Sequence, residues 1–231
     1  MGWVTLLAAD LWHHYGRGRL AADRDVPEVF RWSWSQKGGP GAEVLGDVAG
    51  LRLGDLGAGS ARHAAHLAVH HRPAQVVAVD GSPAQCAMAA DLYGRLAPRL
   101  RIVRADAAGH LLAARGAYDV LYSVFGAVDF TDPRELLPAA AGALRPGGRL
   151  VFSTLAHYLD GAPASHDVRH ADIPARTPEG EATTMRRWVL QEHVWARLLG
   201  ESGFTEPCVL VLPGDGGPRA ADARLVTAGR R

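Results

Sequence analysis

Apolar runs of strand length alternate with helical patterns over most of the chain, from about residue 51 onward. Runs typical of buried strands lie at 51–56, 75–80, 100–106, 117–125 and 149–156. Helical patterns follow at 60–70, after Ser82-Pro83, and from Asp132-Pro133 to about Leu144. Serine before proline is a strong helix-start signal, because it combines an N-cap with a first helical residue that needs no donor. The alternation predicts a buried parallel sheet with right-handed crossovers.

The C-terminal part ends the same pattern in a different way. A helix is predicted over 188–204, followed by two strands at 208–214 and 223–230 that are close enough for a hairpin at the sheet edge. Together the elements predict an α/β fold, Rossmann-like and doubly wound. We expect a mostly parallel seven-stranded sheet with an antiparallel C-terminal edge hairpin.

Two stretches depart from this rhythm. Residues 157–187 are polar and contain proline and histidine, which predicts an inserted loop or cap. Residues 3–15 have the pattern of an amphipathic helix, and 31–41 are rich in aromatic residues and glycine. We therefore divide the chain into an N-terminal helical lid segment, 1–50, and a ligand-binding domain, 51–231.

Composition narrows the class of protein further. With 231 residues, 48% of them hydrophobic, the chain has enough apolar material for one packed core. A net charge of +1 gives no reason to expect nucleic acid as a partner. Cys86 and Cys208 are too isolated for a disulfide framework or a zinc site, and no metal site is predicted. We see no signal peptide and no membrane span, so the cytoplasm is the expected location.

The most informative stretch is the strand, glycine turn and helix between residues 51 and 68. The strand runs into Asp55, then Gly57-Ala58-Gly59-Ser60, and then the helix. Such a turn brings backbone N–H groups and a helix N-terminus close to a ligand, which side chains at the two glycines would block. Alone, the turn indicates a nucleotide site of either of two kinds.

Three carboxylates stand at or near the ends of successive predicted strands, where open α/β sheets bind their ligands. Asp55 lies in the first strand, Asp80 ends the second and Asp106 ends the third. A carboxylate at Asp80 is placed to accept both hydroxyls of a ribose in charge-assisted hydrogen bonds. As isolated acids, Asp55 and Asp106 are more simply explained as a turn cap and a helix start, and only their joint placement favours a ligand site.

A nicotinamide dinucleotide site is the nearest alternative, because it also places an acid after a glycine turn. Its fingerprint requires glycine at a third position, where this chain has Arg62. It also gives no role to Asp55 or Asp106.

The order GDLGAGSAR, VVAVDGSPAQ, RADA, YDVLYSVF and LRPGGRLVFS resembles the class I S-adenosylmethionine-dependent methyltransferases over residues 45–155. The resemblance implies S-adenosylmethionine as cofactor, with Gly57 and Gly59 near its methionine part and Asp80 at its ribose. It further implies that Asp106 and Ala107 frame the adenine, and that Ser123 and Phe125 lie beside the sulfonium. The remaining residues expected around the cofactor are Asp55, Ala58, Gly81, Ser82, Gln85 and Val124. The chain departs from the family pattern at Ala58 and Ala61, where small side chains are tolerable.

The resemblance also implies an N-terminal lid over the cofactor. The aromatic cluster Phe30, Trp32 and Trp34, together with Tyr15 and Gln36, is its candidate, and we expect Tyr15, Trp34 and Gln36 at the cofactor. The alternative is that these aromatic residues only anchor the segment to the core.

A general base is needed only when the acceptor arrives protonated. His157 is the best-placed candidate, since it follows the fifth strand directly, and Tyr158, His166 and His170 lie in the same insertion. The alternative for each is a solvated loop residue. The remaining histidines singled out and one tryptophan pair are interpreted as structural or packing residues: His70, His71, His110, Trp188 and Trp195.

The acceptor is expected to be a small molecule. SVFGAVDF after the fourth strand lacks the Pro-Pro of base and glutamine methylation, Pro207-Cys208 lies far from the methyl group, and Asp129 and Asp132 lack a third metal-binding partner. A secondary metabolite, as in antibiotic biosynthesis, or a modified amino acid or sugar fits best. The alternative is a protein of the same fold that binds the cofactor without methyl transfer, such as a cyclase-like enzyme. The oligomeric state is open, with a homodimer as one option.

Overall fold

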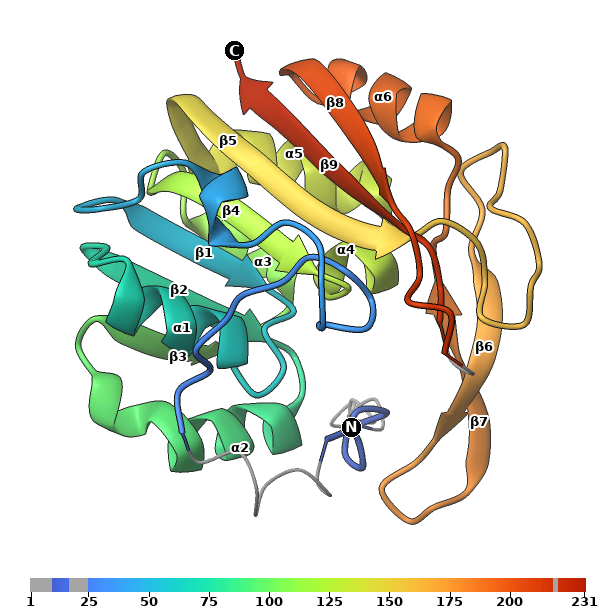
Figure 1. The fold of residues 1–231 in the computed structure, drawn as a ribbon, viewed down its shortest axis with the longest axis horizontal. Helices are drawn as coiled ribbons and strands as arrows, with labels where there is room; N and C mark the ends of the chain where they lie inside the picture. Colours follow the sequence, from blue (N-terminus) through green and yellow to red (C-terminus); the bar gives the residue numbers. More distant parts are fainter. Residues whose placement is uncertain (1–9, 17–24, 218–219) are drawn as a thin grey trace, which may run out of the picture.

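The seven-stranded sheet predicted from the sequence is the centre of the computed structural model, which describes residues 10–16, 25–217 and 220–231 (Figure 1). Its strand order is β3-β2-β1-β4-β5-β9-β8. The first five strands in this order are parallel, and β9 and β8 form the antiparallel edge. The strands are β1 (Arg52–Leu56), β2 (Gln75–Asp80), β3 (Leu100–Arg104), β4 (Tyr118–Val124), β5 (Leu144–Leu155), β8 (Phe204–Leu212) and β9 (Ala223–Arg230).

Helices cover both faces of the sheet, as alternating burial along the strands requires. On one face Val76 and Ala78 pack with α1 and α2, and on the other Val77 and Val79 pack with α3 and α5. The helices are α1 (Arg62–His70), α2 (Pro83–Tyr93), α3 (Ala107–Ala113), α4 (Ala127–Phe130), α5 (Pro133–Ala143) and α6 (Glu192–Glu201), with short 3-10 turns η2 (Ala42–Leu45) and η3 (Gly94–Leu96). No helix of the described part is long and apolar enough to cross a membrane.

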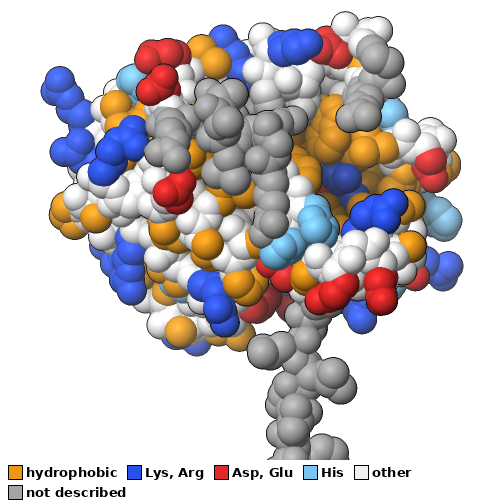
Figure 2. Space-filling model, turned by 90° about the horizontal axis from the view of Figure 1, so that it is seen from below, with side chains coloured by type: hydrophobic (Ala, Val, Ile, Leu, Met, Phe, Trp, Pro, Cys, Tyr) orange, Lys and Arg blue, Asp and Glu red, His pale blue; other side chains and the backbone are white. Residues whose placement is uncertain are grey.

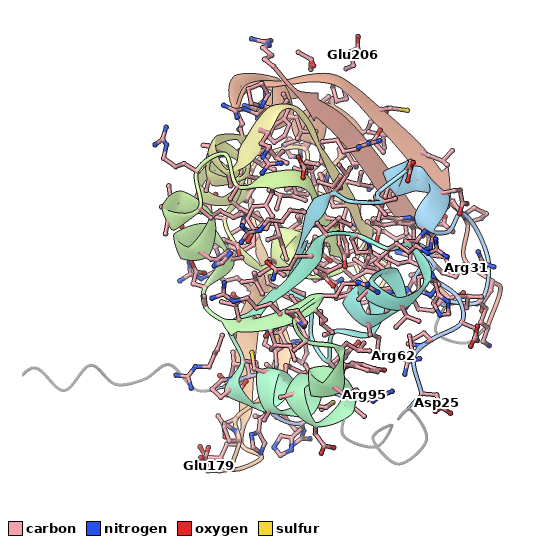
Figure 3. All side chains as sticks on the ribbon, turned by 90° about the vertical axis from the view of Figure 1, so that its left-hand side faces the viewer. Asp25, Arg31, Arg62, Arg95, Glu179 and Glu206 are labelled. Carbon is pink, nitrogen blue, oxygen red and sulfur yellow. The ribbon has the colours of Figure 1, made fainter. Side chains whose placement is uncertain are left out.

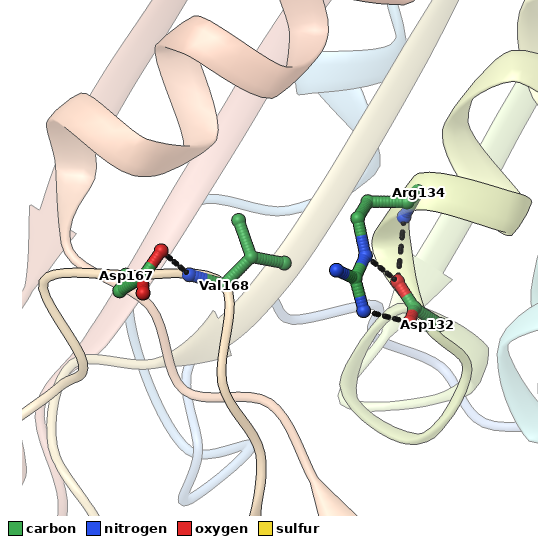
Figure 4. Close-up of polar contacts among 4 residues, drawn as sticks. All are labelled: Asp132, Arg134, Asp167 and Val168. Atoms are coloured by element: carbon green, nitrogen blue, oxygen red, sulfur yellow. Dashed lines mark hydrogen bonds and ion pairs between the residues drawn. The ribbon is translucent and has the colours of Figure 1, made fainter.

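The two proline-marked helix starts form as predicted. Ser82 caps α2 by accepting a hydrogen bond from the Gln85 amide at 3.1 Å. Asp132 caps α5 by accepting from the Arg134 amide at 2.9 Å, and it also pairs with the Arg134 guanidinium (Figure 4).

Two helices predicted from the sequence differ from the structure. Residues 3–9 of the helix expected at 3–15 lie outside the described residues, and residues 11–16 form turns. The helix expected from 188 begins only at Glu192, so Trp188 lies in extended chain before it. Trp188 and Trp195 are both buried packing residues, as interpreted, but they do not share a helix face.

The insertion at 157–187 contains more structure than the predicted loop or cap. β6 (Ala171–Arg176) and β7 (Ala182–Arg187) form an antiparallel hairpin, separate from the main sheet. This hairpin stands beside the carboxyl ends of the parallel strands, and residues 10–16 lie between it and α2 (Figure 1). Another loop of the insertion is fixed locally, where Asp167 accepts from the Val168 amide at 2.7 Å (Figure 4).

The aromatic residues before the sheet were interpreted either as a lid over the cofactor or as an anchor to the core, and the structure places them in two different environments. Phe30 and Trp32 are buried in the core against α1 and β4, and the Trp32 indole donates to the Gly41 carbonyl at 2.8 Å. These two residues therefore anchor the segment. Trp34 instead lies farther along, toward the carboxyl ends of the strands, and packs on Phe125.

The glycines of the turn after β1 differ in the room around them, which gives a matched pair of variants. Gly57 has φ +73°, and a Cβ there would lie 2.8 Å from the Gly126 carbonyl carbon, whereas a Cβ at Gly59 (φ +55°) would only reach Gln85 at 3.6 Å. We expect G57A to lower the free energy of unfolding by about 3 kcal/mol or more. G59A should cost only the left-handed strain of about 1–2 kcal/mol. Urea unfolding of both variants tests this, and equal losses would contradict it.

Candidate functional site

The glycine turn after β1 is bound to the end of β2 by the backbone. The amides of Gly57 and Ala58 both donate to the Val79 carbonyl, at 2.9 and 3.0 Å. The turn then enters α1 through Ala61, which has a left-handed φ of 60° and is fully buried. This geometry leaves the backbone of the turn facing the carboxyl ends of the strands.

Asp80, at the end of β2, links the turn to the start of α2. Its Oδ2 accepts from the Gly59 amide and its Oδ1 from the Ser82 amide, each at 2.8 Å. Burial raises the pKa of Asp80, and these two hydrogen bonds oppose that rise. Each carboxylate oxygen keeps a further acceptor site, so the group can still accept from a ligand.

A cavity of about 1620 Å³ opens over the carboxyl ends of the strands. Figure 2 shows the molecule from below the view of Figure 1. On this face the surface is hollowed, and hydrophobic side chains border the hollow. Most residues predicted around the cofactor line this cavity: Tyr15, Trp34, Gln36, Gly57, Ala58, Gly59, Asp80, Gly81, Ser82, Gln85, Asp106, Ala107, Val124 and Phe125. The topology thus brings together positions that are up to about a hundred residues apart.

Asp106 serves two purposes. Its Oδ2 accepts a hydrogen bond from the Gly109 amide at 2.7 Å, so Asp106 caps α3. This agrees with its simpler interpretation as a helix start. Its exposed carboxylate also lines the cavity beside Ala107.

Asp55 and Ser123 do not line the cavity, in contrast to the prediction. The apolar strands around Asp55 leave it 2% exposed, and burial raises its pKa to about 8, with the Tyr122 hydroxyl beside it acting in the opposite direction. Ser123 is fully buried and donates to the Leu56 carbonyl at 2.7 Å. Both side chains lie within the sheet beneath the site, where Ser123 links β4 to β1.

His157 is also placed away from the cavity. Its Nδ1 lies 2.9 Å from the Tyr158 carbonyl oxygen, and its ring borders a separate shallow pocket near α6. The chain turns away from the strand ends after β5, which the sequence pattern did not reveal. The other candidates of the insertion do not line the cavity either: Tyr158, His166 and His170.

His63, which the sequence analysis missed, does line the cavity. It lies on the first turn of α1, with its Nε2 2.9 Å from Oε1 of Gln36. Burial lowers the pKa of His63 to about 4, so it is neutral at pH 7. His70 and His71 lie at the far end of the same helix, and His110 contacts the Tyr118 hydroxyl at 2.6 Å, in agreement with their structural interpretation.

Residues 10–16 belong to the N-terminal lid predicted over 1–50, and from here on only they are called the lid segment. They are bound to the start of α2. Asp10 Oδ2 accepts from the Ser82 hydroxyl at 2.9 Å and the Ala84 amide at 3.1 Å. The side-chain amide nitrogen of Gln85 (Nε2) donates to the backbone carbonyls of Trp12 and Tyr15, both at 2.9 Å. Asp10 and Trp12 line the cavity, and the sequence analysis singled out neither residue.

The opposite side of the lid segment reaches the β6–β7 hairpin. His14 Nε2 lies 3.1 Å from the Thr177 carbonyl and 3.0 Å from the Pro178 carbonyl. Glu179, in the same hairpin turn, lies at the α2 end of the molecule, opposite Glu206 (Figure 3). The lid segment therefore bridges α2 and the hairpin across the cavity mouth.

A buried ion pair ties the hairpin to α4. Arg187 Nη2 lies 2.6 Å from Asp129 Oδ2, and the side chains are 5% and 0% exposed. Burial raises the pKa of Asp129, and the Arg187 guanidinium opposes that rise. The sequence analysis weighed Asp129 only as a metal-ligand candidate, and it did not consider Arg187.

Comparison with known proteins relates the fold to that of methyltransferases. The family model described as "Methyltransferase domain" matches residues 54–152. The matched residues run from within β1 to within β5 and include the glycine turn, Asp80 and Asp106. No curated protein matches the sequence significantly.

Solved structures share the fold of this chain. An S-adenosylmethionine-dependent methyltransferase from Mesorhizobium loti is 22% identical, with a TM-score of 0.59, 81% of this chain covered and 94% of that one. The 1,6-didemethyltoxoflavin-N1-methyltransferase of Burkholderia thailandensis, solved with its substrate and S-adenosylhomocysteine, is 21% identical (TM-score 0.54; 79% and 72% covered). The [4+2]-cyclase SpnF is 20% identical (TM-score 0.57; 79% and 76% covered).

The burial of Asp55 predicts a specific pH dependence of stability. Because its pKa is raised to about 8, the native state keeps a proton that the unfolded state loses near pH 4. The free energy of unfolding of the wild type should therefore fall relative to D55N as pH rises from 5 to 8, by up to about 1.4 kcal/mol per pH unit. Denaturant unfolding at several pH values measures this.

The exposed Asp47 provides the control, since D47N should follow the wild type at every pH. Parallel stability profiles of the wild type and D55N would show that Asp55 is ionised in the folded protein.

Proposed function

We propose that this protein transfers the methyl group of S-adenosylmethionine to a small molecule in the cavity described above. The observation that carries the proposal is the Asp80 carboxylate, held beside the glycine turn by the Gly59 and Ser82 amides. In the proposed arrangement Asp80 accepts the ribose hydroxyls and Gly57 to Gly59 lie along the methionine part.

The residues present fit the remaining parts of the cofactor. Gly59 has a positive φ and no atom closer than 3.6 Å to the position of an added Cβ, so a ligand can approach its backbone. Asp106 and Ala107 line the next part of the cavity, where we place the adenine. Val124 and Phe125, at the end of β4, are assigned to the sulfonium side. Asp55 and Ser123 are assigned a supporting role only.

The chemistry follows from positioning. When bound, the cofactor supplies an activated methyl group, so the chain's own residues need mainly to orient the acceptor and exclude water. The lid segment is suited to the second task, because it is held on one side by Ser82 and Gln85 and on the other by the hairpin turn. A general base is not assigned.

Small-molecule specificity is supported by the toxoflavin-pathway neighbour, which acts on 1,6-didemethyltoxoflavin. A secondary metabolite of antibiotic biosynthesis remains our expectation for the acceptor, and the cytoplasm for the location.

The second candidate function is cofactor binding without methyl transfer. It is favoured by the place of His157 outside the cavity and by a cyclase among the structural neighbours. Formation of S-adenosylhomocysteine in the presence of acceptor would exclude it.

Asp80 provides the direct test of the cofactor site. We expect D80A to weaken binding of S-adenosylhomocysteine by well over tenfold, because the ribose loses two charge-assisted hydrogen bonds. Isothermal titration calorimetry measures the affinity, and circular dichroism shows whether the variant is folded. The exposed Asp160, outside the cavity, supplies the control D160A, which should bind as the wild type does. Unchanged affinity of a folded D80A would refute the site.

A further inference from the structure

Aromatic side chains gather in the cavity. The chain has six tryptophans, five tyrosines and five phenylalanines, and six of these residues line this one cavity: Trp12, Tyr15, Trp34, Phe125, Phe130 and Trp188. They come from the lid segment, the loop before η2, the end of β4, α4 and the chain after β7. Segments this far apart in sequence supply the same kind of surface, which indicates a ligand that uses it.

Two of these rings are packed on a buried cation. The guanidinium carbon of Arg187 lies 5.6 Å from the centroid of the Trp34 ring and 5.2 Å from that of Phe130. A guanidinium at this distance is attracted to the ring face and fixes the ring's orientation. Because Arg187 pairs with Asp129 at 2.6 Å, its charge is already neutralised and is not free to bind an anionic substrate.

Further ring contacts fix the same two side chains from the sides. Trp34 meets Phe125 in an edge-to-face contact at 5.0 Å, and Phe130 meets Trp12 in the same way at 4.6 Å. Edge-to-face packing with a fixed cation leaves Trp34 and Phe130 little freedom, so their exposed surface is preorganised.

The hairpin contributes Met185 to the cavity lining, together with the polar side chains of Asp172, Thr184 and Arg186. Met185 and Arg187 lie on the same, inward face of β7, since side chains two apart in a strand share a face. Ile173 of β6 is the cross-strand partner of Met185, and both are half-buried. The flexible thioether of Met185 can adapt its shape to an apolar ligand.

The cavity has room for a second molecule. Its volume of about 1620 Å³ exceeds the roughly 300–1,000 Å³ typical of a pocket for one small ligand. The cofactor is assigned to the part between the glycine turn, Asp80 and Asp106, which leaves the part lined by Trp34, Phe130 and the hairpin for the acceptor. Trp34, which was expected at the cofactor from the sequence, is thereby assigned to the acceptor.

We propose that the methyl acceptor is a planar aromatic or heteroaromatic molecule that packs on Trp34 and Phe130, and that Arg187 with Asp129 positions these two rings. The inference rests on the proposed function and names the substrate class of the same site. It gives Arg187 a positioning role, because its charge is paired and it acts through the rings.

The test uses the full chain saturated with S-adenosylhomocysteine and two neutral probes of nearly equal size, 2-naphthol and decahydro-2-naphthol. Ligand-observed NMR titration measures their affinities. We expect the aromatic probe to bind at least fivefold more tightly than its saturated counterpart. Trp34→Leu should remove most of this preference, and Trp34→Phe should retain it, because a ring remains. Leu210→Ala, on an exposed part of β8 outside the cavity, is the control and should change nothing.

Arg187→Lys tests the positioning role. It keeps a cation for Asp129 but loses the planar group between the rings. The preference for the aromatic probe should fall at least threefold, while the affinity for S-adenosylhomocysteine stays within twofold. If this variant does not fold, the Trp34 pair still decides the substrate class.

Three results would overturn the inference: equal binding of the two probes, an aromatic preference that Trp34→Leu leaves intact, or binding of neither probe at millimolar concentration. Calorimetry with S-adenosylhomocysteine separates these results from a failure of the proposed function. If the cofactor product binds and the aromatic preference is absent, only the acceptor class is wrong. If the cofactor product does not bind, the methyltransferase site itself is wrong.

Discussion

A close backbone contact between two turns is the constraint on which the site depends. Gly57, after β1, packs against Gly126, after β4, and a Cβ on Gly126 would lie 2.6 Å from the Gly57 carbonyl oxygen. With Ser123 donating to Leu56 from below, the two strand ends are held at one fixed spacing. The amides of the first turn can therefore meet the Val79 carbonyl and the Asp80 carboxylate at the end of β2. Larger residues at either glycine would separate the turns and disperse the groups that face the cavity.

The rest of the site is built onto this rigid edge by contacts from distant parts of the chain. The lid segment binds the start of α2 through Asp10, and the hairpin binds α4 through Arg187 and Asp129. The two additions meet where His14 contacts the hairpin turn. In the proposed arrangement, cofactor and acceptor share one cavity, with the ends of the parallel strands as its floor and the lid segment and the hairpin as its walls.

Local signals explain why much of this could be predicted from the sequence. The strands, the glycine turn and the Ser82-Pro83 helix start are encoded within a few residues, and the parallel topology then brings Asp80 and Asp106 to one edge. The failures concern long-range geometry. Asp129 and Arg187 are 58 residues apart, and Asp10 and Ser82 are 72 apart, so no spacing rule links them. His157 was misplaced because its position depends on the direction in which the chain leaves β5. Asp55 was assigned to the cofactor because an acid in an apolar strand does not reveal whether its side chain faces the cavity or the sheet interior.

The most direct test of the account is a crystal structure of the protein with S-adenosylhomocysteine. We predict that both ribose hydroxyls contact the Asp80 carboxylate, that the adenine lies beside Asp106 and Ala107, and that the sulfur faces the part of the cavity lined by Trp34 and Phe130. A ligand bound elsewhere, or bound here with its ribose away from Asp80, would contradict the account.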